Sequence, residues 1–388
     1  RRLKISIVGA GNAGCFTALY YSWYGRKKDL EVELIHDPNI APQEVGQATL
    51  LGAPELLGTG FNYYDNHIHA TPKTGILYEG FGKVNDKFIH AFPANTLAMH
   101  FCPCEVQKFA LESGRFNVVE GNVDPKDVDA DYVFDCRGTP KDFTGYTKLQ
   151  SPINAAILGK PKWDSKELWS RHVATPDGWA FVIPMDESSP SHNGAVGYLY
   201  NNKITKTEDA KKNFGQIFDV EVKGQKTFNN YMHMNPIDDR VILQGNRLFF
   251  LEPMESTATE TYLEWARRTF RVIIEGELTK DDAIKGMKKY IKQIQNFILW
   301  HYQFGSKYDT PFWEHAKNII FHDPLFDKFL DKATALKLEE CEEVSYSDYN
   351  SGVTWKGDGY REASLAYSVW PLMSFKNWHE GMTLYKGE

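Results

Sequence analysis

Apolar and polar stretches alternate along the N-terminal part of the chain in the order strand, turn, helix, strand. Residues 3–8 (LKISIV) form a short β-branched run that ends at a glycine, which predicts a buried strand. The stretch from about Asn12 to Tyr24 has the length of a helix, and residues 31–35 (EVELI) predict a second strand. We therefore expect a βαβ unit at the start of the chain.

The turn between the first strand and the helix has the GxGxxG spacing. Its glycines permit a sharp turn, a close approach of a diphosphate to the backbone and close helix–strand packing. The free N–H groups at the start of the helix favour phosphate. The expected nucleotide contacts here are Gly9, Gly11, Asn12, Ala13 and Gly14.

Two strand ends carry acidic residues that distinguish between nucleotides. The second strand ends at His36 and Asp37, and the sequence leaves open which of them meets a ribose hydroxyl. Residues 129–138 (DADYVFDCRG) predict a late strand that ends in Asp135 and Gly138. An Asp-x-x-Gly end more than a hundred residues after the first strand favours FAD over a nicotinamide nucleotide, with a long insertion between two strands of one sheet.

Helical periodicity dominates the later chain, with an amphipathic stretch from about Asp281 to Phe304. We predict an α/β (α+β) fold: an FAD-binding Rossmann-type domain of the flavin monooxygenase type, an inserted substrate-region sheet and a mostly helical C-terminal part. The expected FAD domain spans residues 1–260, with inserted segments at about 50–130 and 150–240. Residues 261–388 are expected to pack on the substrate side.

Composition narrows the class of protein. The net charge of −7 indicates no nucleic-acid surface, and no long apolar run predicts a membrane span. Five sparse cysteines favour a cytoplasmic protein without disulfides. Cys102 and Cys104 are expected to be structural thiols. His67 and His69, close to Asp65, are interpreted as loop, so no metal site is predicted.

Several segments, taken in order, resemble one family. They are residues 72–76 (PKTGI), 178–184 (GWAFVIP), 251–257 (LEPMEST), and 297–302 (FILWHY) with 309–313 (DTPFW). They are similar to the lysine-bearing strand, the WxWxIP signature, the E-P-L-E-S-T segment, and a later helix and loop of the flavin-dependent tryptophan-halogenase family. The resemblance runs from about residue 3 to about residue 315.

The resemblance implies that reduced FAD, oxygen and a halide yield hypohalous acid, which reaches Lys73. Lys73 polarises the oxidant or becomes an N-haloamine, and Glu255 accepts a proton during electrophilic substitution. The halide, chloride, bromide or iodide, is expected beside Thr257 and Ala258. Further flavin contacts are expected from Gln47, Ala48, Thr49, Trp179, Phe181, Ile183, Pro184 and Gly245.

Some of these residues have a simpler structural interpretation. Glu255, Ser256 and Thr257, followed by Glu260, also have the pattern of a helix cap, and both interpretations can hold. Trp179 and Phe181 share one strand face, where they pack in the core, shield the flavin, or do both. His301 is expected to be a packing histidine.

The chain departs from the family pattern at several positions. It is shorter than typical members, Gln47 replaces a glutamate, Phe181 replaces a tryptophan, and Ala258 replaces a glycine. Residues 340–388 contain no match to the residues that clamp tryptophan, so free tryptophan is not the expected substrate. The shorter C-terminal region predicts a more open pocket. Residues 345–370, rich in Tyr, Gly, Ser and Trp, cover the entrance or mediate self-association.

The partners expected from the resemblance are an electron-rich aromatic substrate and a separate flavin reductase. Two other functions stay open. A flavin monooxygenase would pass oxygen directly to the substrate and would not need Lys73. A non-catalytic flavoprotein module would bind a partner without turnover, although Lys73 and Glu255 are both intact.

Overall fold

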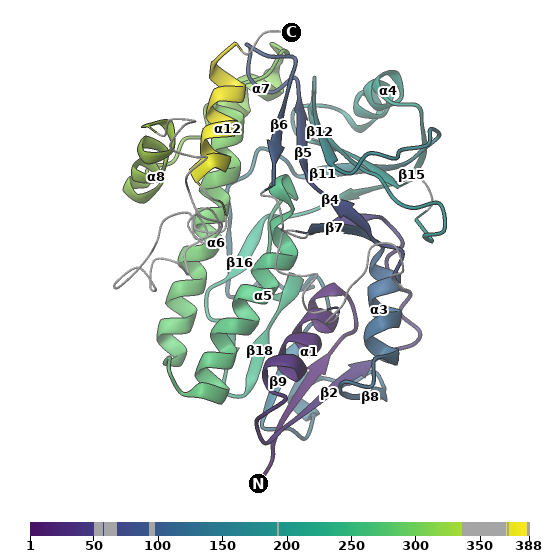
Figure 1. Ribbon diagram of the computed structural model, residues 1–388, viewed down its shortest axis with the longest axis vertical. Coiled ribbons are helices and arrows are strands. Elements are labelled where there is room, and N and C mark those ends of the chain that lie inside the picture. The colour runs from purple at the N-terminus through teal and green to yellow at the C-terminus, as the bar shows by residue number, and fades with distance from the viewer. Residues whose placement is uncertain are drawn as a thin grey trace.

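The computed structural model describes residues 1–49, 57, 68–92, 98–191, 194–335, 370 and 372–385. Within them, one six-stranded sheet lies near the N-terminus and one seven-stranded sheet lies toward the opposite end, with long helices along one side (Figure 1). This arrangement matches the mixed α/β class predicted from the sequence.

The six-stranded sheet carries the glycine-rich turn. Its order is β17 (Ile237–Asp238), β18 (Val241–Leu243), β9 (Tyr132–Asp135), β1 (Leu3–Val8), β2 (Leu30–His36) and β8 (Asn117–Glu120). β1 pairs in parallel with β2 and β9, so that Val8 lies opposite both Ile35 and Asp135. The carboxyl ends of these strands meet where α1 (Asn12–Tyr24) begins, which is the edge where nucleotides bind in this class of sheet.

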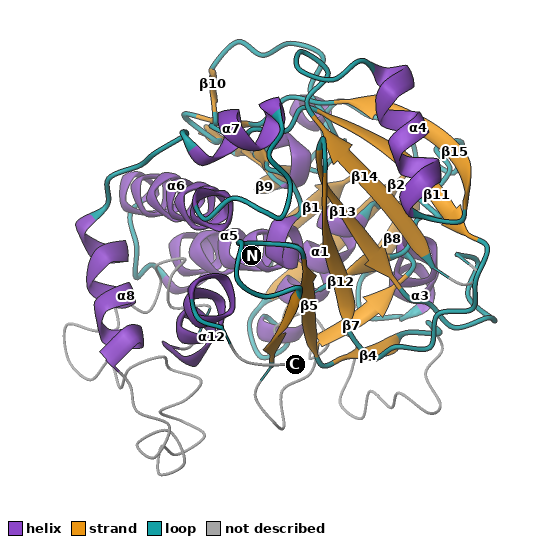
Figure 2. Cartoon of the chain, turned by 90° about the horizontal axis from the view of Figure 1, so that it is seen from above, coloured by secondary structure: helices purple, strands orange, loops and turns teal. Residues whose placement is uncertain are grey.

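The seven-stranded sheet is mostly antiparallel and is built from inserted segments. Its order is β15 (Val220–Thr227), β11 (Ala155–Pro161), β14 (Ala195–Tyr200), β13 (Gly178–Ile183), β12 (Ser170–Thr175), β5 (Gly75–Glu79) and β6 (Lys87–Ala91). Helix α4 (Thr207–Ile217) lies on one side of it, and α6 (Lys280–Gln303), α8 (Pro324–Ala335) and α12 (Leu372–Thr383) lie on the other side of the molecule (Figure 2).

A small sheet connects the nucleotide side with the lysine strand. Its central strand β7 (Ala98–Phe101) pairs antiparallel with both β3 (Gln47–Ala48) and β4 (Thr71–Lys73). Ala48 lies opposite His100, and Lys73 lies opposite Ala98. Helix α3 (Pro103–Glu112) follows β7. Another small sheet contains β10 (Tyr146–Lys148), β16 (Tyr231–His233) and β19 (Phe249–Phe250).

Helix α5 (Thr257–Phe270) packs along α1, and the Tyr21 hydroxyl donates to Thr269 Oγ1 at 2.9 Å. The predicted domain boundary at residue 260 falls inside α5, and the division itself stays a prediction. Helix α6 begins at a Thr279 cap, and α7 (Pro311–Lys317) begins at a Thr310 cap. Among the described helices, none is long and apolar enough to cross a membrane.

Candidate active site

Lys73 ends β4 with its ammonium group buried; the residue is 2% exposed. Nζ donates to the Thr49 carbonyl oxygen at 3.1 Å and to Ser256 Oγ at 2.9 Å. The Phe92 ring centroid lies 5.3 Å from Nζ. Burial lowers the pKa of Lys73 to about 7, and the nearby Glu255 carboxyl opposes this shift. Near neutral pH the Lys73 amine can therefore take up or release a proton.

The turn before α5 orients two neighbouring side chains differently. Glu255 and Ser256 have φ values of 64° and 56°, in the left-handed region that non-glycine residues seldom adopt. Ser256 precedes α5 but its side chain makes no cap hydrogen bond. Its hydroxyl accepts from Lys73 instead. The helix-cap interpretation of this segment is therefore wrong for Ser256.

The Glu255 carboxylate lies between two histidines. His301 Nε2 is 3.2 Å from Oε1, and His90 Nδ1 is 3.4 Å from Oε2. All three side chains are at most 1% exposed. Burial raises the pKa of Glu255, although His301 and Lys73 oppose the shift. His301 packs in the core as predicted, but it also contacts the candidate base, which the sequence interpretation missed.

Helix α12 encloses this group from the C-terminal side. Ser374 Oγ lies 2.7 Å from His90 Nε2, and the Trp378 ring centroid lies 4.2 Å from that of His90. Trp370 stacks on Phe297 with centroids 3.9 Å apart. Lys73 and Glu255 are both buried beside these contacts, and the more open pocket expected from the shorter chain stays a prediction. The role predicted for residues 345–370 falls, apart from Trp370, outside the described residues.

Glu252 is a second buried carboxyl group. It accepts hydrogen bonds from Trp179 Nε1 at 3.1 Å and, at short range, from the hydroxyls of Ser151 and Tyr302. Burial raises the pKa of Glu252 to about 7, while these donors oppose the shift. Both carboxylate oxygens of Glu252 already accept hydrogen bonds from the protein. Glu252 therefore links β13 and α6 to the segment before Glu255, and we assign it no contact with a ligand.

The glycine-rich turn leaves space for a phosphate. A side chain added at Gly11 would meet nothing within 4 Å, and no side chain caps α1 or adds acid to its first turn. Asn12 Nδ2 donates to Gln47 Oε1 at 2.8 Å, while Asn12 Oδ1 is buried without a partner among the described residues. Gln47 thus ties β3 to the start of α1. This arrangement fits a diphosphate.

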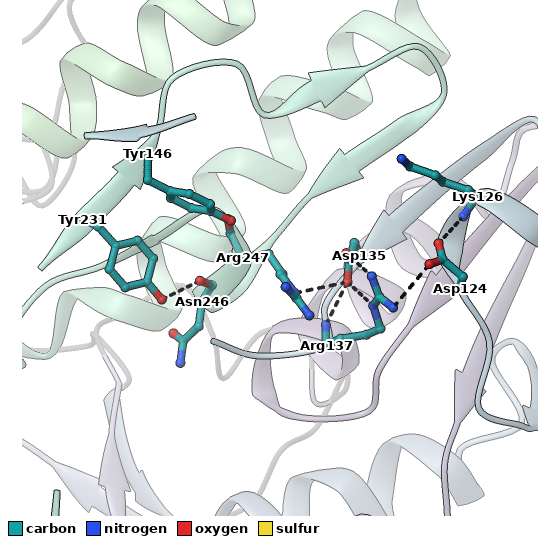
Figure 3. Close-up of polar contacts among 8 residues, drawn as sticks. All are labelled: Asp124, Lys126, Asp135, Arg137, Tyr146, Tyr231, Asn246 and Arg247. Carbon is teal, nitrogen blue, oxygen red and sulfur yellow. Dashed lines mark hydrogen bonds and ion pairs between the residues drawn. The ribbon is translucent and has the colours of Figure 1, made fainter. Parts of the chain in front are cut away.

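Asp135 does not stand free at the end of β9 (Figure 3). Its carboxylate accepts from Arg137 Nε and NH2 at 2.9 Å each, and Arg247 Nε lies 3.6 Å from Oδ1. The Tyr146 and Tyr231 hydroxyls donate to the backbone carbonyls of the turn Gly245–Arg247. Two arginines, which sequence reasoning did not select, therefore border the expected nucleotide site.

The turn Gly245–Arg247 lies directly against α1. A Cβ at Gly245, whose φ is +65°, would fall 2.4 Å from Ala13 Cβ. Likewise, a Cβ at Gly9 would meet the Cys136 carbonyl oxygen at 2.5 Å, so that only glycine permits this approach of the two strand ends. Arg247 Nε is buried without a hydrogen-bond partner among the described residues. A further hydrogen-bond acceptor would satisfy it.

The remaining expected contacts separate into two groups. Asp37 accepts from Asn39 and Asn122 on the surface, and the backbone hydrogen bond from Asn39 lowers its pKa. These contacts do not decide between His36 and Asp37. A side chain at Gly138 would meet open space.

On β13, Trp179 is fully buried in the main core. The other expected residues of this region, Phe181, Ile183 and Ala48, share a smaller apolar cluster, with Pro184 after the strand.

The expected halide position is the start of α5. Thr257 is 3% exposed and Ala258 follows it in the first turn. Ser256 makes no side-chain cap hydrogen bond at this helix, and the N-terminus of a helix favours an anion. The halide assignment to Thr257 and Ala258 stays a prediction.

Among the described residues, no group of three or more His, Cys, Asp or Glu side chains could hold a metal ion. Cys102 Sγ lies 2.7 Å from Cys104 Sγ, and both are free thiols. Burial, together with Cys102, raises the pKa of Cys104 to about 12. Asp65, His67 and Cys341 lie outside the described residues.

The chain is similar in sequence to known proteins. The family model for tryptophan halogenase matches residues 4–118 and 105–350. The chain belongs to the tryptophan halogenase family. Tryptophan 7-halogenase KtzQ of Kutzneria sp. (strain 744) is 24% identical over 227 residues, and tryptophan 6-halogenase ThaL of Streptomyces albogriseolus is 20% identical over 202 residues. These alignments cover 51% and 48% of this chain, and 40% and 36% of the relatives.

Solved structures share the fold along nearly the whole chain. MibH, a lathipeptide tryptophan 5-halogenase, aligns with a TM-score of 0.75 at 18% identity, covering 98% of this chain and 86% of MibH. A tryptophan halogenase from Shewanella frigidimarina NCIMB 400 aligns at 0.74 with 17% identity, covering 98% and 89%. The family and fold expected from the motifs are therefore confirmed. This family member keeps Lys73 and Glu255 in one buried site, although they are far apart in the sequence.

Proposed function

We propose that this chain is a flavin-dependent halogenase that acts on an electron-rich aromatic substrate. The supporting observation is the buried group in which Lys73 hydrogen-bonds to Ser256, beside Glu255. A buried amine and a buried carboxyl offer a proton donor and a proton acceptor at the same site, as electrophilic halogenation requires. The aromatic side chains of Phe92, His90 and Trp378 would suit a planar ring.

FAD would lie across the carboxyl edge of the six-stranded sheet. Its diphosphate would meet the N–H groups of α1 above Gly11, and its ribose would lie near His36 and Asp37. Asp135 shares its carboxylate with Arg137, so Arg247 is the group we assign to a phosphate oxygen. Reduced FAD, supplied by a separate reductase, provides hypohalous acid from oxygen and halide when bound.

The residues of the chain would then guide that oxidant. Lys73 would bind hypohalous acid through an N–H not used by Thr49 or Ser256. Enclosure by β13 and α12 would keep other water from the site. Glu255 would take the proton lost by the aromatic ring.

The test incubates the protein with FAD, a flavin reductase, NADH, catalase and a panel of indoles and phenols. Chloride, bromide and iodide are supplied in separate reactions, and products are identified by mass spectrometry. Lys73→Ala and Lys73→Met are assayed alongside. We expect a halide-specific mass gain that both variants lose while flavin oxidation continues.

Each other outcome identifies a competing function. A hydroxylated product in every halide would establish the monooxygenase. Flavin binding without any product from the panel, and without halide-dependent oxidation of a thiol probe, would favour the binding module.

A further inference from the structure

The hydrogen bond on the far side of the His301 ring determines where its proton lies. Nδ1 is 2.7 Å from the Phe297 carbonyl oxygen, one helical turn earlier on α6. A carbonyl oxygen can only accept, so this partner assigns an N–H to Nδ1. In a neutral imidazole, Nε2 is then a lone-pair acceptor.

That lone pair faces another acceptor. Nε2 lies 3.2 Å from Glu255 Oε1, and both side chains are buried. Two acceptors at this distance repel each other unless a proton lies between them. The contact is favourable as O–H···N or as N–H⁺···O⁻, and each form contains one added proton. The geometry therefore suits the pair after it has taken up a proton.

We propose that Glu255 and His301 act as one proton acceptor during halogenation, with the proton shared between Oε1 and Nε2. This inference rests on the proposed function. The halogen of hypohalous acid bonds to the ring carbon, and the hydroxide leaves as water with a proton from Lys73. The C–H electron pair then returns to the ring, and the ring proton passes to the Glu255–His301 pair. Return of that proton to Lys73 restores the starting state.

The charged and titratable groups around the pair agree with this cycle. Lys73 lies near it from β4, His90 from β6 and His172 from β12. Tyr78 of β5 has its ring centroid 5.8 Å from that of His301, and the Glu252 carboxyl is electrostatically coupled to His301. Helix α12 contributes the neutral Ser374 and Trp378. Burial and the neighbouring Lys73 lower the pKa of both His90 and His172 well below the usual value. Those two rings are therefore neutral near pH 7, and His301 is the ring with a fixed Nε2 lone pair toward Glu255.

One experiment needs neither flavin nor substrate. Protein labelled with ¹⁵N-histidine is titrated by NMR, with His301→Gln to assign the signals and Glu255→Gln to remove the partner. We expect the Nδ1–H form throughout neutral pH, and an Nε2 signal that changes on titration in the wild type but not in Glu255→Gln. An Nε2–H form in the neutral ring would overturn the proposal.

The kinetic experiment uses ring-deuterated and ordinary indole in single-turnover bromination. Loss of the shared acceptor should slow ring deprotonation, so His301→Gln should lose roughly 100-fold in rate with little change in KM. A primary isotope effect should appear, and the acidic limb of the pH–rate profile should shift, because the titration of the pair is replaced by that of Glu255 alone. His315→Asn, at an exposed histidine on α7, serves as the control and should show neither change.

The outcomes distinguish this inference from the proposed function. If the wild type halogenates nothing but the NMR titration behaves as expected, the proton-sharing pair stands and the proposed function fails. If halogenation occurs and His301→Gln keeps the wild-type pH profile without an isotope effect, the pair does not act as the acceptor. His301→Phe, which cannot hydrogen-bond, should be at least as slow as His301→Gln.

Discussion

Lys73 Nζ donates a hydrogen bond to Ser256 Oγ at 2.9 Å, joining residues 183 positions apart. The bond connects the lysine strand with the strained turn that presents Glu255. It therefore sets the position of the amine relative to the carboxyl group, which neither element could do alone.

Removing the Ser256 hydroxyl should misplace Lys73. A hydrogen bond to a charged group contributes about 1.5–3 kcal/mol, so Ser256→Ala should lose roughly 10- to 100-fold in halogenation rate. Steady-state kinetics with product analysis measures this loss, and FAD affinity should not change. Ser256→Gly also removes the hydroxyl but relaxes the left-handed backbone. A loss in the alanine variant alone would indicate strain rather than the hydrogen bond.

Burial of the Lys73 amine should cost stability in a pH-dependent way. Its pKa is about 7 in the folded protein and near the ordinary 10.5 in the unfolded chain. Between these values the unfolded state binds more protons, so wild-type stability from this group rises with pH. Lys73→Met should stabilise by up to roughly 4 kcal/mol near pH 6, and by much less near pH 10. Thermal unfolding at both pH values tests this; an equal gain at both would contradict it.

The contribution of Glu252 to stability should change with pH in the opposite direction to that of Lys73. The pKa of Glu252 is about 7 in the folded protein and near 4.5 when unfolded. Between these values the folded state binds more protons, so the stability from this group is present below about pH 4.5 and is lost as pH rises through about 7. The stability of Glu252→Gln relative to wild type should rise across this range by up to roughly 3 kcal/mol. Denaturant unfolding at several pH values measures it.

The assignment of Arg247 to a phosphate can be tested with flavins that carry or lack phosphate. Arg247→Gln should weaken FAD binding about 10- to 100-fold, since a charge-assisted hydrogen bond to a phosphate is lost. Riboflavin, which lacks phosphate, should bind both proteins equally. Fluorescence titration measures each Kd. Arg247→Lys should recover part of the affinity, and an equal loss for riboflavin would exclude a phosphate contact.

Local signals were sufficient for the nucleotide side of the molecule. The apolar run at residues 3–8, the glycine spacing and the helix to Tyr24 are each contained in a few neighbouring residues, and β1 and α1 form at these positions. Gly9 was selected from the GxGxxG spacing, and the close approach to Cys136 found there is one that only glycine permits. The role of Arg247 gave no such signal, because surface arginines are common and nothing local distinguishes this one.

The active-site partners depended on contacts between distant elements. His301 was visible in the sequence, but its contact with Glu255 requires α6 to pack on the turn before α5. Ser256 has the pattern of a helix cap, yet the neighbouring Lys73 takes its hydroxyl. The contacts of α12 with His90 and His301 could not be predicted from the sequence either, since chain length does not report which surface a terminal helix covers.

The sequence by itself determined the family and the βαβ unit and selected Lys73 and Glu255 as candidates, because motifs and periodicity are properties of residues close together in the chain. Only the tertiary structure decided which groups share a hydrogen bond, which carboxyl groups are saturated and which nitrogen of His301 faces Glu255. These properties depend on distances of a few ångströms between residues far apart in sequence, and on burial, which changes how readily each group holds a proton.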